Sequence, residues 1–286
     1  MSPDSSPGLS DVKILKDLER AILKNVGGLV TLQDEFPKMI RKALDEVIDT
    51  PRTGRLTIDQ IEKTEKTYIG TKVEILFRNM IGFPKGILDL NVDGVDVDIK
   101  NTVGKNWTLP PEVVNKACIL ISSDEAKALC NLGLVVVRAE YLSHGQNRDG
   151  KRSLTKENFK HIHWIFKDLP YQPNFWRDID AARVKRIFRP RGGTDRLVQM
   201  LREIQSVPIH RDIVIGIAQQ DDPMKRLRKN GGARDKLAED GIVVLSGTYD
   251  KNLIERLDLP FCTRSEFISY QTRTGEEKDL LKDKLS

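Results

Sequence analysis

The sequence predicts a mixed α+β protein, and three observations support this. Apolar residues recur at helical spacing through most of residues 11–80, and the period then changes to two. Helical spacing returns, mixed with short strands, after residue 177. The length of 286 residues fits one large domain or two smaller ones. The stretch LPYQPNFW (169–176), which contains proline and aromatic residues, is the predicted linker between two domains.

Composition excludes several classes of protein. Hydrophobic residues make up 39% and charged residues 31%, as in ordinary globular proteins. No apolar run approaches the roughly 18 residues of a membrane-spanning helix, and the N-terminus lacks the pattern of a secretory signal. Cys118, Cys130 and Cys262 are too few and too scattered for a disulfide framework or a zinc site. We therefore expect a protein of the reducing cytoplasm that does not enter the membrane.

The first half is expected to contain helices followed by strands. Residues 1–9 should form a disordered tip, and the helical pattern over 11–49 breaks at Gly27-Gly28, which indicates two helices. Thr57-Ile58-Asp59 would cap a third helix that ends near Met80. The period-two pattern predicts strands at 87–92, 95–100, 118–121 and 134–138.

The second half is expected to alternate helices and strands. Helices are predicted near 178–188 and 195–206, the second capped by Thr194, and strands at 213–218 and 242–245. A short basic helix over 223–230 would be capped by Asp222 and ended by Gly231-Gly232. Residues 271–286 resemble a charged tail. Residues 177–234 hold 14 basic and 7 acidic side chains, net +7, so the second half carries most of the positive charge.

The hairpin around Asp93-Gly94 carries the strongest chemical signal. Asp-Gly is typical of a two-residue turn, which would place Asp89 directly opposite Asp98. Two carboxylates facing each other at about 5 Å repel, and a divalent cation between them removes that penalty. Oxygen ligands of this kind suit Mg²⁺.

Two further residues extend the candidate site. Strand alternation places Lys100 on the same face as Asp98, where its ammonium could stabilise charge developing on a metal-bound phosphate. Glu74, on the preceding helix, could add a third carboxylate. Asp96 shares the face but lies nearer the turn, where we expect it to be solvated. This layout is typical of a metal-dependent phosphodiesterase, although polar residues on the wet face of a surface hairpin would give a similar pattern.

At these residues the sequence resembles the NaeI-type restriction endonucleases, a branch of the PD-(D/E)xK nucleases. The resemblance is collinear from about Leu44 to Leu245. Its segments are RTGRLTIDQIEKTEKTYIGTKVEI (52–75), VDVDIK (95–100), LPPE (109–112), IAQQDDPMKRLRKNGGAR (217–234) and GIVVL (241–245).

The resemblance implies a domain organisation and an activity. It implies an endonuclease domain over 10–168, with a central mixed sheet flanked by helices, and a mainly helical, winged-helix-like effector domain over 177–270. Glu74, Asp89, Asp98 and Lys100 would be catalytic, with the three carboxylates as Mg²⁺ ligands. The implied enzyme is a type II (type IIE) homodimer that cleaves double-stranded DNA at a specific site and leaves 5′-phosphates. It would also bind a second copy of that DNA site, which activates cleavage. A cognate DNA methyltransferase would be its genetic partner.

DNA-binding candidates lie mainly in the second half. Gln219 and Gln220 could read base edges, and nearby basic side chains could neutralise phosphates. The basic candidates are Lys225, Arg226, Arg228, Lys229 and Arg234; candidates in the first half are Arg52, Arg55 and Asn101.

Two alternatives stay open: a repair-type nicking nuclease of the same fold, and a DNA-binding module with an inactive nuclease site. Residue spacing and charge do not define which bases are read. The recognition site is therefore suggested by the resemblance alone, as a GC-rich palindrome such as GCCGGC.

Overall fold

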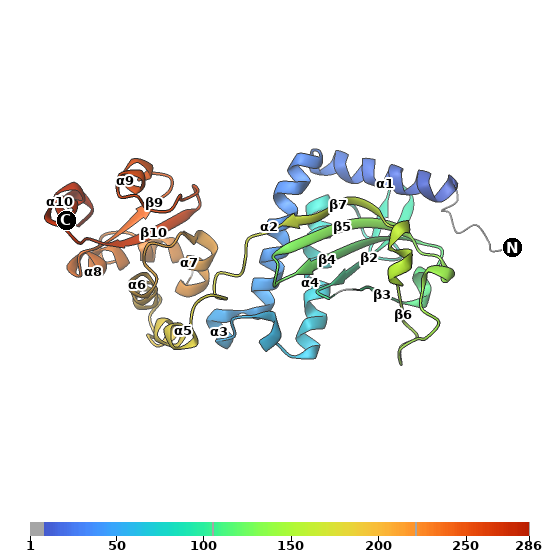
Figure 1. The fold of residues 1–286 in the computed structure, drawn as a ribbon, viewed down its shortest axis with the longest axis horizontal. Helices are drawn as coiled ribbons and strands as arrows, with labels where there is room; N and C mark the ends of the chain where they lie inside the picture. The colour runs from blue at the N-terminus through green and yellow to red at the C-terminus, as the bar shows by residue number, and fades with distance from the viewer. Residues whose placement is uncertain (1–8, 105, 221, 286) are drawn as a thin grey trace. The chain divides into compact units, whose positions relative to one another are not determined.

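The computed structural model describes residues 9–104, 106–220 and 222–285. The chain divides into two compact units (Figure 1). The first contains the residues up to Thr50 together with Arg55–Arg177, and the second contains Pro51–Gly54 and the residues from Asp178 onward. Of the expected disordered tip, residues 1–8 lie outside the described residues, and Leu9 begins the first helix.

The first unit is built on a five-stranded mixed sheet in the order β1-β2-β4-β5-β7. Strands β2 and β4 run parallel, and every other neighbouring pair is antiparallel. The prediction of a mixed α/β protein is therefore confirmed, with a central sheet and flanking helices. The strands are β1 (Leu90–Val92), β2 (Val95–Thr102), β4 (Ala117–Asp124), β5 (Leu129–Val136) and β7 (His163–Pro170).

Three long helices share one hydrophobic core with one face of this sheet. They are α1 (Leu9–Val26), α2 (Leu29–Ile48) and α4 (Lys63–Ile81). The predicted break between α1 and α2 is confirmed, because Gly27 and Gly28 both adopt positive φ angles, of 87° and 109°. The opposite face packs against a second apolar cluster that includes Trp107, Leu109 and Tyr141.

The predicted start of the third helix is wrong. Thr57 caps only the 3₁₀ turn η1 (Ile58–Gln60), and its N–H donates to Gln60 Oε1 at 3.0 Å. The α-helix begins later, at Lys63, with Glu62 as the capping residue. The remaining elements before residue 163 are short: α3 (Thr50–Thr53), β3 (Thr108–Leu109), η2 (Pro111–Val113), η3 (Ala139–Tyr141), β6 (Arg152–Ser153) and η4 (Lys156–His161).

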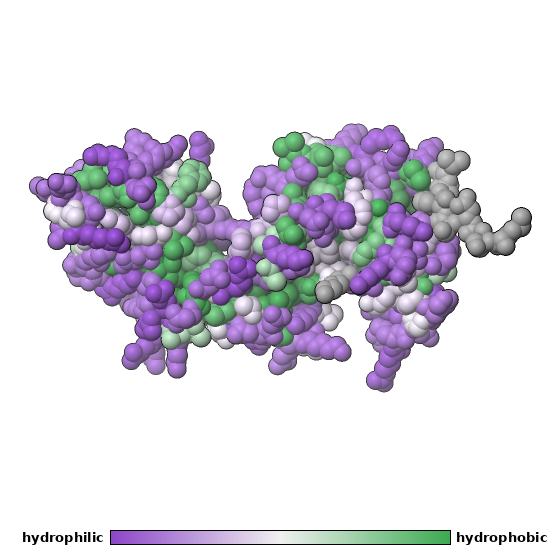
Figure 2. Space-filling view, in the orientation of Figure 1, coloured by the Kyte–Doolittle hydropathy of each residue, from purple (hydrophilic) through white to green (hydrophobic). Residues whose placement is uncertain are grey.

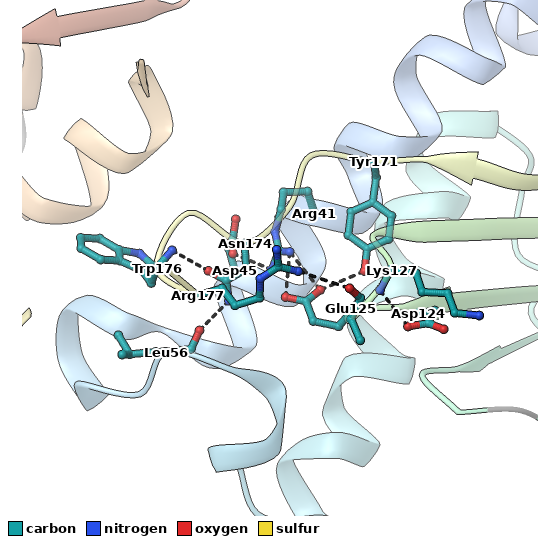
Figure 3. Close-up of polar contacts among 11 residues, drawn as sticks. Arg41, Asp45, Leu56, Asp124, Glu125, Lys127, Tyr171, Asn174, Trp176 and Arg177 are labelled. Carbon is teal, nitrogen blue, oxygen red and sulfur yellow. Dashed lines mark hydrogen bonds and ion pairs between the residues drawn. The ribbon is translucent and has the colours of Figure 1, made fainter. Parts of the chain in front are cut away.

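Residues 169–176, expected to form a linker, are packed against the first unit. Its first two residues complete β7, and Tyr171, Asn174 and Trp176 are buried. Tyr171 donates from its hydroxyl to Glu125 Oε2 at 2.9 Å, and Asn174 Nδ2 donates to the Leu56 carbonyl at 2.5 Å (Figure 3). The segment is therefore attached to the first unit through hydrogen bonds and packing.

The second unit combines helices with a three-stranded antiparallel sheet in the order β8-β10-β9. Its strands are β8 (Ile209–His210), β9 (Ile242–Ser246) and β10 (Glu266–Gln271). Its helices are α5 (Ala181–Phe188), α6 (Gly193–Glu203), α7 (Arg211–Ala218), η5 (Pro223–Leu227), α8 (Ala233–Glu239), α9 (Lys251–Arg256), α10 (Gly275–Leu280) and α11 (Lys282–Leu285).

Several predictions for this unit are corrected. The expected strand over 213–218 is helix α7, whose buried residues Val214, Ile217 and Ala218 follow helical spacing. Gly192, not Thr194, precedes the first turn of α6.

The expected charged tail is folded. Thr274 caps α10 by accepting the Glu277 N–H at 3.2 Å. Leu281 is fully buried in the apolar cluster that contains β9 and β10 side chains, which attaches residues 275–285 to the sheet. Among the described residues, no helix is long and apolar enough to cross a membrane.

Candidate active site

The β1–β2 hairpin has the register that the sequence predicts. Leu90 pairs with Val97 and Asn91 with Asp96, and the chain turns through Asp93 (φ 49°) and Gly94 (φ 88°). Positive φ at both central residues is the geometry that an Asp-Gly turn favours.

The predicted strand from Ile87 is too long, because the ladder stops at Leu90. Asp89 is not a ladder partner of Asp98: its side-chain Oδ2 accepts the backbone N–H of Ile99 at 2.7 Å. The Asp89 carboxylate therefore accepts the Ile99 N–H, which in a longer β1 strand would be bonded to a backbone carbonyl.

Strand alternation separates core from site along β2. Val97 and Ile99 are buried in the core shared with the helices. Asp98 and Lys100 lie on the other face, as predicted, and the Lys100 Nζ is 2.5 Å from Asp98 Oδ2. Asp98 is only 5% exposed, so this ion pair lies largely out of water.

Cys118 adds a contact that the sequence does not predict. In the parallel register of β2 and β4 it lies beside Asp98, and its Sγ donates to Asp98 Oδ2 at 3.5 Å. Burial raises the pKa of the Cys118 thiol well above its ordinary value, so the thiol keeps its proton and remains a donor. The sequence offers no signal for this contact, because it depends on a strand pairing that brings together two residues 20 positions apart in the chain.

Glu74 completes the group from helix α4. Burial raises the pKa of the Glu74 carboxyl, and the nearby charge of Asp89 raises it further. Arg78, one turn later, lies 3.5 Å from Glu74 Oε1 and partly offsets this effect. The structure thus brings Glu74 to the same region as Asp89, as the sequence suggested.

Burial disfavours the charged forms of Glu74 and Asp98. Burial raises the pKa of Asp98, against the opposing hydrogen bond from Lys100, and the charge of Asp89 also raises it. Burial works against the charge on Lys100, yet Asp98 keeps the pKa of Lys100 above its ordinary value. A cation bound beside Glu74 or Asp98 would favour the charged form of that carboxylate.

The donor set fits a divalent cation bound by few protein ligands. Among the described residues, no three His, Cys, Asp or Glu side chains form a ready-made metal site. Asp98 is engaged by Lys100, while Glu74 and Asp89 repel each other. Mg²⁺ commonly binds through one or two carboxylates and takes its other ligands from water and phosphate, so the residues fit Mg²⁺ in that form.

The first-half DNA candidates differ in their surroundings. Arg55 is paired with Glu65, with Nη1 2.5 Å from Oε1, and Arg52 is exposed. Asn101 follows Lys100 on β2, and its buried Oδ1 has no hydrogen-bond partner among the described residues.

The second-half candidates divide into exposed and engaged residues. The predicted helix over 223–230 is shorter, a 3₁₀ turn over Pro223–Leu227, and Asp222 caps it as expected by accepting the Lys225 N–H. Arg234 donates to the Val244 carbonyl, and burial lowers its pKa, so this guanidinium is held inside the unit. Lys229 donates to the Asp283 carbonyl at 2.9 Å. The other candidates are exposed: Gln219, Gln220, Lys225, Arg226 and Arg228.

Figure 2 shows hydrophilic side chains over most of the visible surface.

Comparison with known proteins identifies the family. The family model described as "Restriction endonuclease NaeI" matches residues 33–280, which include the β1–β2 hairpin and the basic segment. The "Type II restriction enzyme NaeI" of Lentzea aerocolonigenes is 32% identical over 256 residues, which cover 86% of this chain and 80% of the relative. The family match extends on both sides beyond residues 44–245, whose motifs carry the resemblance in the sequence. The chain therefore belongs to the NaeI family of type II restriction endonucleases.

Proposed function

We propose that this chain hydrolyses double-stranded DNA at a specific short sequence, with Mg²⁺ bound through one or two of the carboxylates Asp89, Asp98 and Glu74. The observation that supports this most directly is the Asp98–Lys100 ion pair, with the charge of Asp89 acting on both Asp98 and Glu74 where β1 ends early, in a chain of the NaeI family. In this proposal residues 10–168 form an endonuclease domain of the PD-(D/E)xK type. The parallel pairing of β2 with β4 in a mixed sheet supports that fold.

Each residue has a separate role in the proposed mechanism. Bound Mg²⁺ would supply a water of lowered pKa and neutralise charge on the scissile phosphate. Asp89 is oriented by the Ile99 N–H. Lys100, held by Asp98, provides an ammonium for charge that develops on the phosphate oxygens. Glu74, with its raised pKa, can hold or orient the attacking water. In-line attack would leave 5′-phosphate and 3′-hydroxyl ends.

We further propose that the second unit binds an activating copy of the recognition site, and that the enzyme acts as a homodimer. Residues 177–270 would form the winged-helix-like effector domain, which the combination of helices with a three-stranded antiparallel sheet supports. The exposed side chains of Lys225, Arg226 and Arg228 can neutralise phosphates, and the exposed Gln219 and Gln220 can reach base edges. A DNA methyltransferase that protects the host site is the implied genetic partner.

Cleavage of plasmid DNA tests the nuclease. The purified full chain is incubated with plasmid in Mg²⁺ or EDTA, beside Asp98→Ala and the hairpin control Asp93→Asn. Discrete fragments that require Mg²⁺, persist in the control and vanish in Asp98→Ala support the proposal, and sequencing their ends gives the site. Nicked circles alone would indicate a nicking enzyme. Sequence-specific binding without any cleavage would indicate a DNA-binding module.

A single-site plasmid tests the effector role. Adding a short duplex that carries the recognition site should accelerate cleavage, and the triple variant of Lys225, Arg226 and Arg228 to Ala should lose the acceleration while retaining basal cleavage. Equal acceleration in the triple variant would contradict the placement of the effector site.

A further inference from the structure

The loop that leads into β1 is fastened by a side chain from β2. Leu88 lies outside β1, and its backbone N–H donates to both carboxylate oxygens of Asp96, at 3.0 Å to Oδ1 and 3.2 Å to Oδ2. The loop is also tied to β1 where the Asn91 N–H donates to the Pro84 carbonyl at 2.9 Å. Asp96, expected to be solvated near the turn, is therefore only partly exposed and bonded to the loop.

Gly86 shows how closely the loop approaches this carboxylate. A methyl group built on Gly86 would collide with Asp96 Oδ1 and would lie 2.5 Å from the Leu90 carbonyl oxygen. The backbone of the loop thus lies directly against Asp96, and only glycine leaves room for that approach.

Asp89 directly follows the residue that Asp96 holds. It lies outside the β1–β2 ladder, so regular strand pairing does not orient it. Its backbone directly follows Leu88, which Asp96 holds, and its own Oδ2 accepts the Ile99 N–H at 2.7 Å. Two hydrogen bonds to β2, one on each side of the Leu88–Asp89 peptide, therefore define where the carboxylate lies.

We propose that Asp96 is a positioning residue for the cleavage reaction: it holds the Leu88 N–H and thereby orients Asp89, and it does not itself bind the metal. The inference rests on the proposed function for its catalytic consequence. The conservative variant separates the two roles. Asn at position 96 keeps one oxygen that can accept the Leu88 N–H, but it lacks the charge that a metal-binding carboxylate supplies.

The test compares Asp96→Ala, Asp96→Asn and Gly86→Ala with the control Asp93→Asn, which removes a carboxylate from the turn of the same hairpin. Two quantities are measured on the full chain. One is amide hydrogen exchange of the segment 84–92, which does not depend on activity. The other is the single-turnover cleavage rate at saturating Mg²⁺, with DNA affinity measured in Ca²⁺ as a binding control.

We expect Asp96→Ala and Gly86→Ala to accelerate exchange at Leu88 and to slow cleavage by about 10- to 100-fold, as loss of an orienting partner does elsewhere. DNA affinity should stay within about twofold of wild type, and Asp93→Asn should resemble wild type in all three measurements. Asp96→Asn should recover most of the protection and cleave within about threefold of wild type.

Three results would overturn the inference. Asp96→Asn as slow as Asp96→Ala would show that the charge matters and not the hydrogen bond. Unchanged exchange in Asp96→Ala would show that the carboxylate does not hold the loop. If Asp96→Ala does not fold, Gly86→Ala becomes the test. Normal exchange and normal cleavage in Gly86→Ala would then overturn the inference. A wild-type protein that cleaves no DNA would instead refute the proposed function, and the exchange comparison would still decide whether Asp96 holds the loop.

Discussion

Two charged clusters in the first unit each pair a basic side chain with carboxylates, but the carboxylates lie in different surroundings. In the first, Arg41 on α2 donates to both oxygens of Glu125 at 3.0 Å and pairs with Asp45 Oδ1 at 2.7 Å (Figure 3). Burial opposes the charge on Arg41, yet the two carboxylates raise its pKa above the ordinary value. The second cluster is the active site, where burial and like charge raise the pKa values of Glu74 and Asp98.

The difference distinguishes a structural cluster from a functional one. In the Arg41 cluster the geometry stabilises the charged state. In the active site, burial and a neighbouring carboxylate oppose the charges of Glu74 and Asp98, and the basic side chains of Arg78 and Lys100 offset this only in part. Groups whose pKa values are raised by burial and by a specific neighbour are typical of functional sites.

The largest expected effect is on stability, from Arg41→Ala. Removing the arginine, which is 8% exposed, leaves the Glu125 carboxylate, 12% exposed, without its ionic partner, which should cost about 3–5 kcal/mol in the free energy of unfolding. Denaturant titration followed by circular dichroism measures the loss. The control is Lys42→Ala on the same helix, whose exposed ammonium lies 4.0 Å from Glu46. A loss below about 1 kcal/mol for Arg41→Ala would remove the distinction between the two clusters.

Asp98→Asn should have the opposite profile, with activity lost and the fold retained. The change removes one charge from the site and releases Lys100, so we expect cleavage to slow by about 100- to 1,000-fold. Single-turnover cleavage at saturating Mg²⁺ gives the rate, and thermal unfolding in EDTA gives the stability. Strong destabilisation together with normal cleavage would assign Asp98 a structural role.

Glu74→Gln should stabilise the metal-free protein. A neutral amide removes the repulsion from Asp89 that contributes to the raised pKa of Glu74, and relief of this kind commonly adds about 0.5–2 kcal/mol. The same variant should lose cleavage, because a change that stabilises the protein at an active-site carboxylate commonly removes activity. Thermal unfolding in EDTA checks the sign, and a lower melting temperature than wild type would show that the pairing with Arg78 outweighs the repulsion.

The smallest effect is expected for Arg186→Ala in the second unit. Arg186 contacts both oxygens of Glu203 at 2.7 and 2.9 Å, much as Arg41 contacts Glu125, but half of its side chain is exposed. Solvent screens such pairs, so the melting temperature should fall by no more than about 2 °C.

The pH dependence of this pair has a defined sign. The hydrogen bond from Arg186 holds the pKa of Glu203 below its ordinary value of 4.5. A lowered carboxyl pKa contributes stability above the unfolded value, and that contribution is lost as the pH falls through the folded value. The difference between wild type and Arg186→Ala should therefore shrink below pH 4.5 and in high salt. A difference that grows on acidification would contradict this assignment.

Much of the fold was predictable because it depends on neighbouring residues. The break at Gly27-Gly28 and the Asp93-Gly94 turn are local in origin, and so is the alternation that separates Asp98 and Lys100 from the core. The prediction of a strand over 213–218 was wrong, because a short apolar run fits either period and its packing against the rest of the unit decides between them.

The sequence by itself determined the hairpin and its register, the order of acidic and basic residues along β2, and the excess of positive charge in the second half. Only the tertiary structure decided which donor or acceptor each of these groups meets. It joined Asp89 to Ile99, Asp96 to Leu88 and Cys118 to Asp98, and it turned Arg234 inward to the Val244 carbonyl. The physical reason is that turns and periodicity are set by neighbours in the chain, whereas the partner of a side chain depends on which strands and loops pack together.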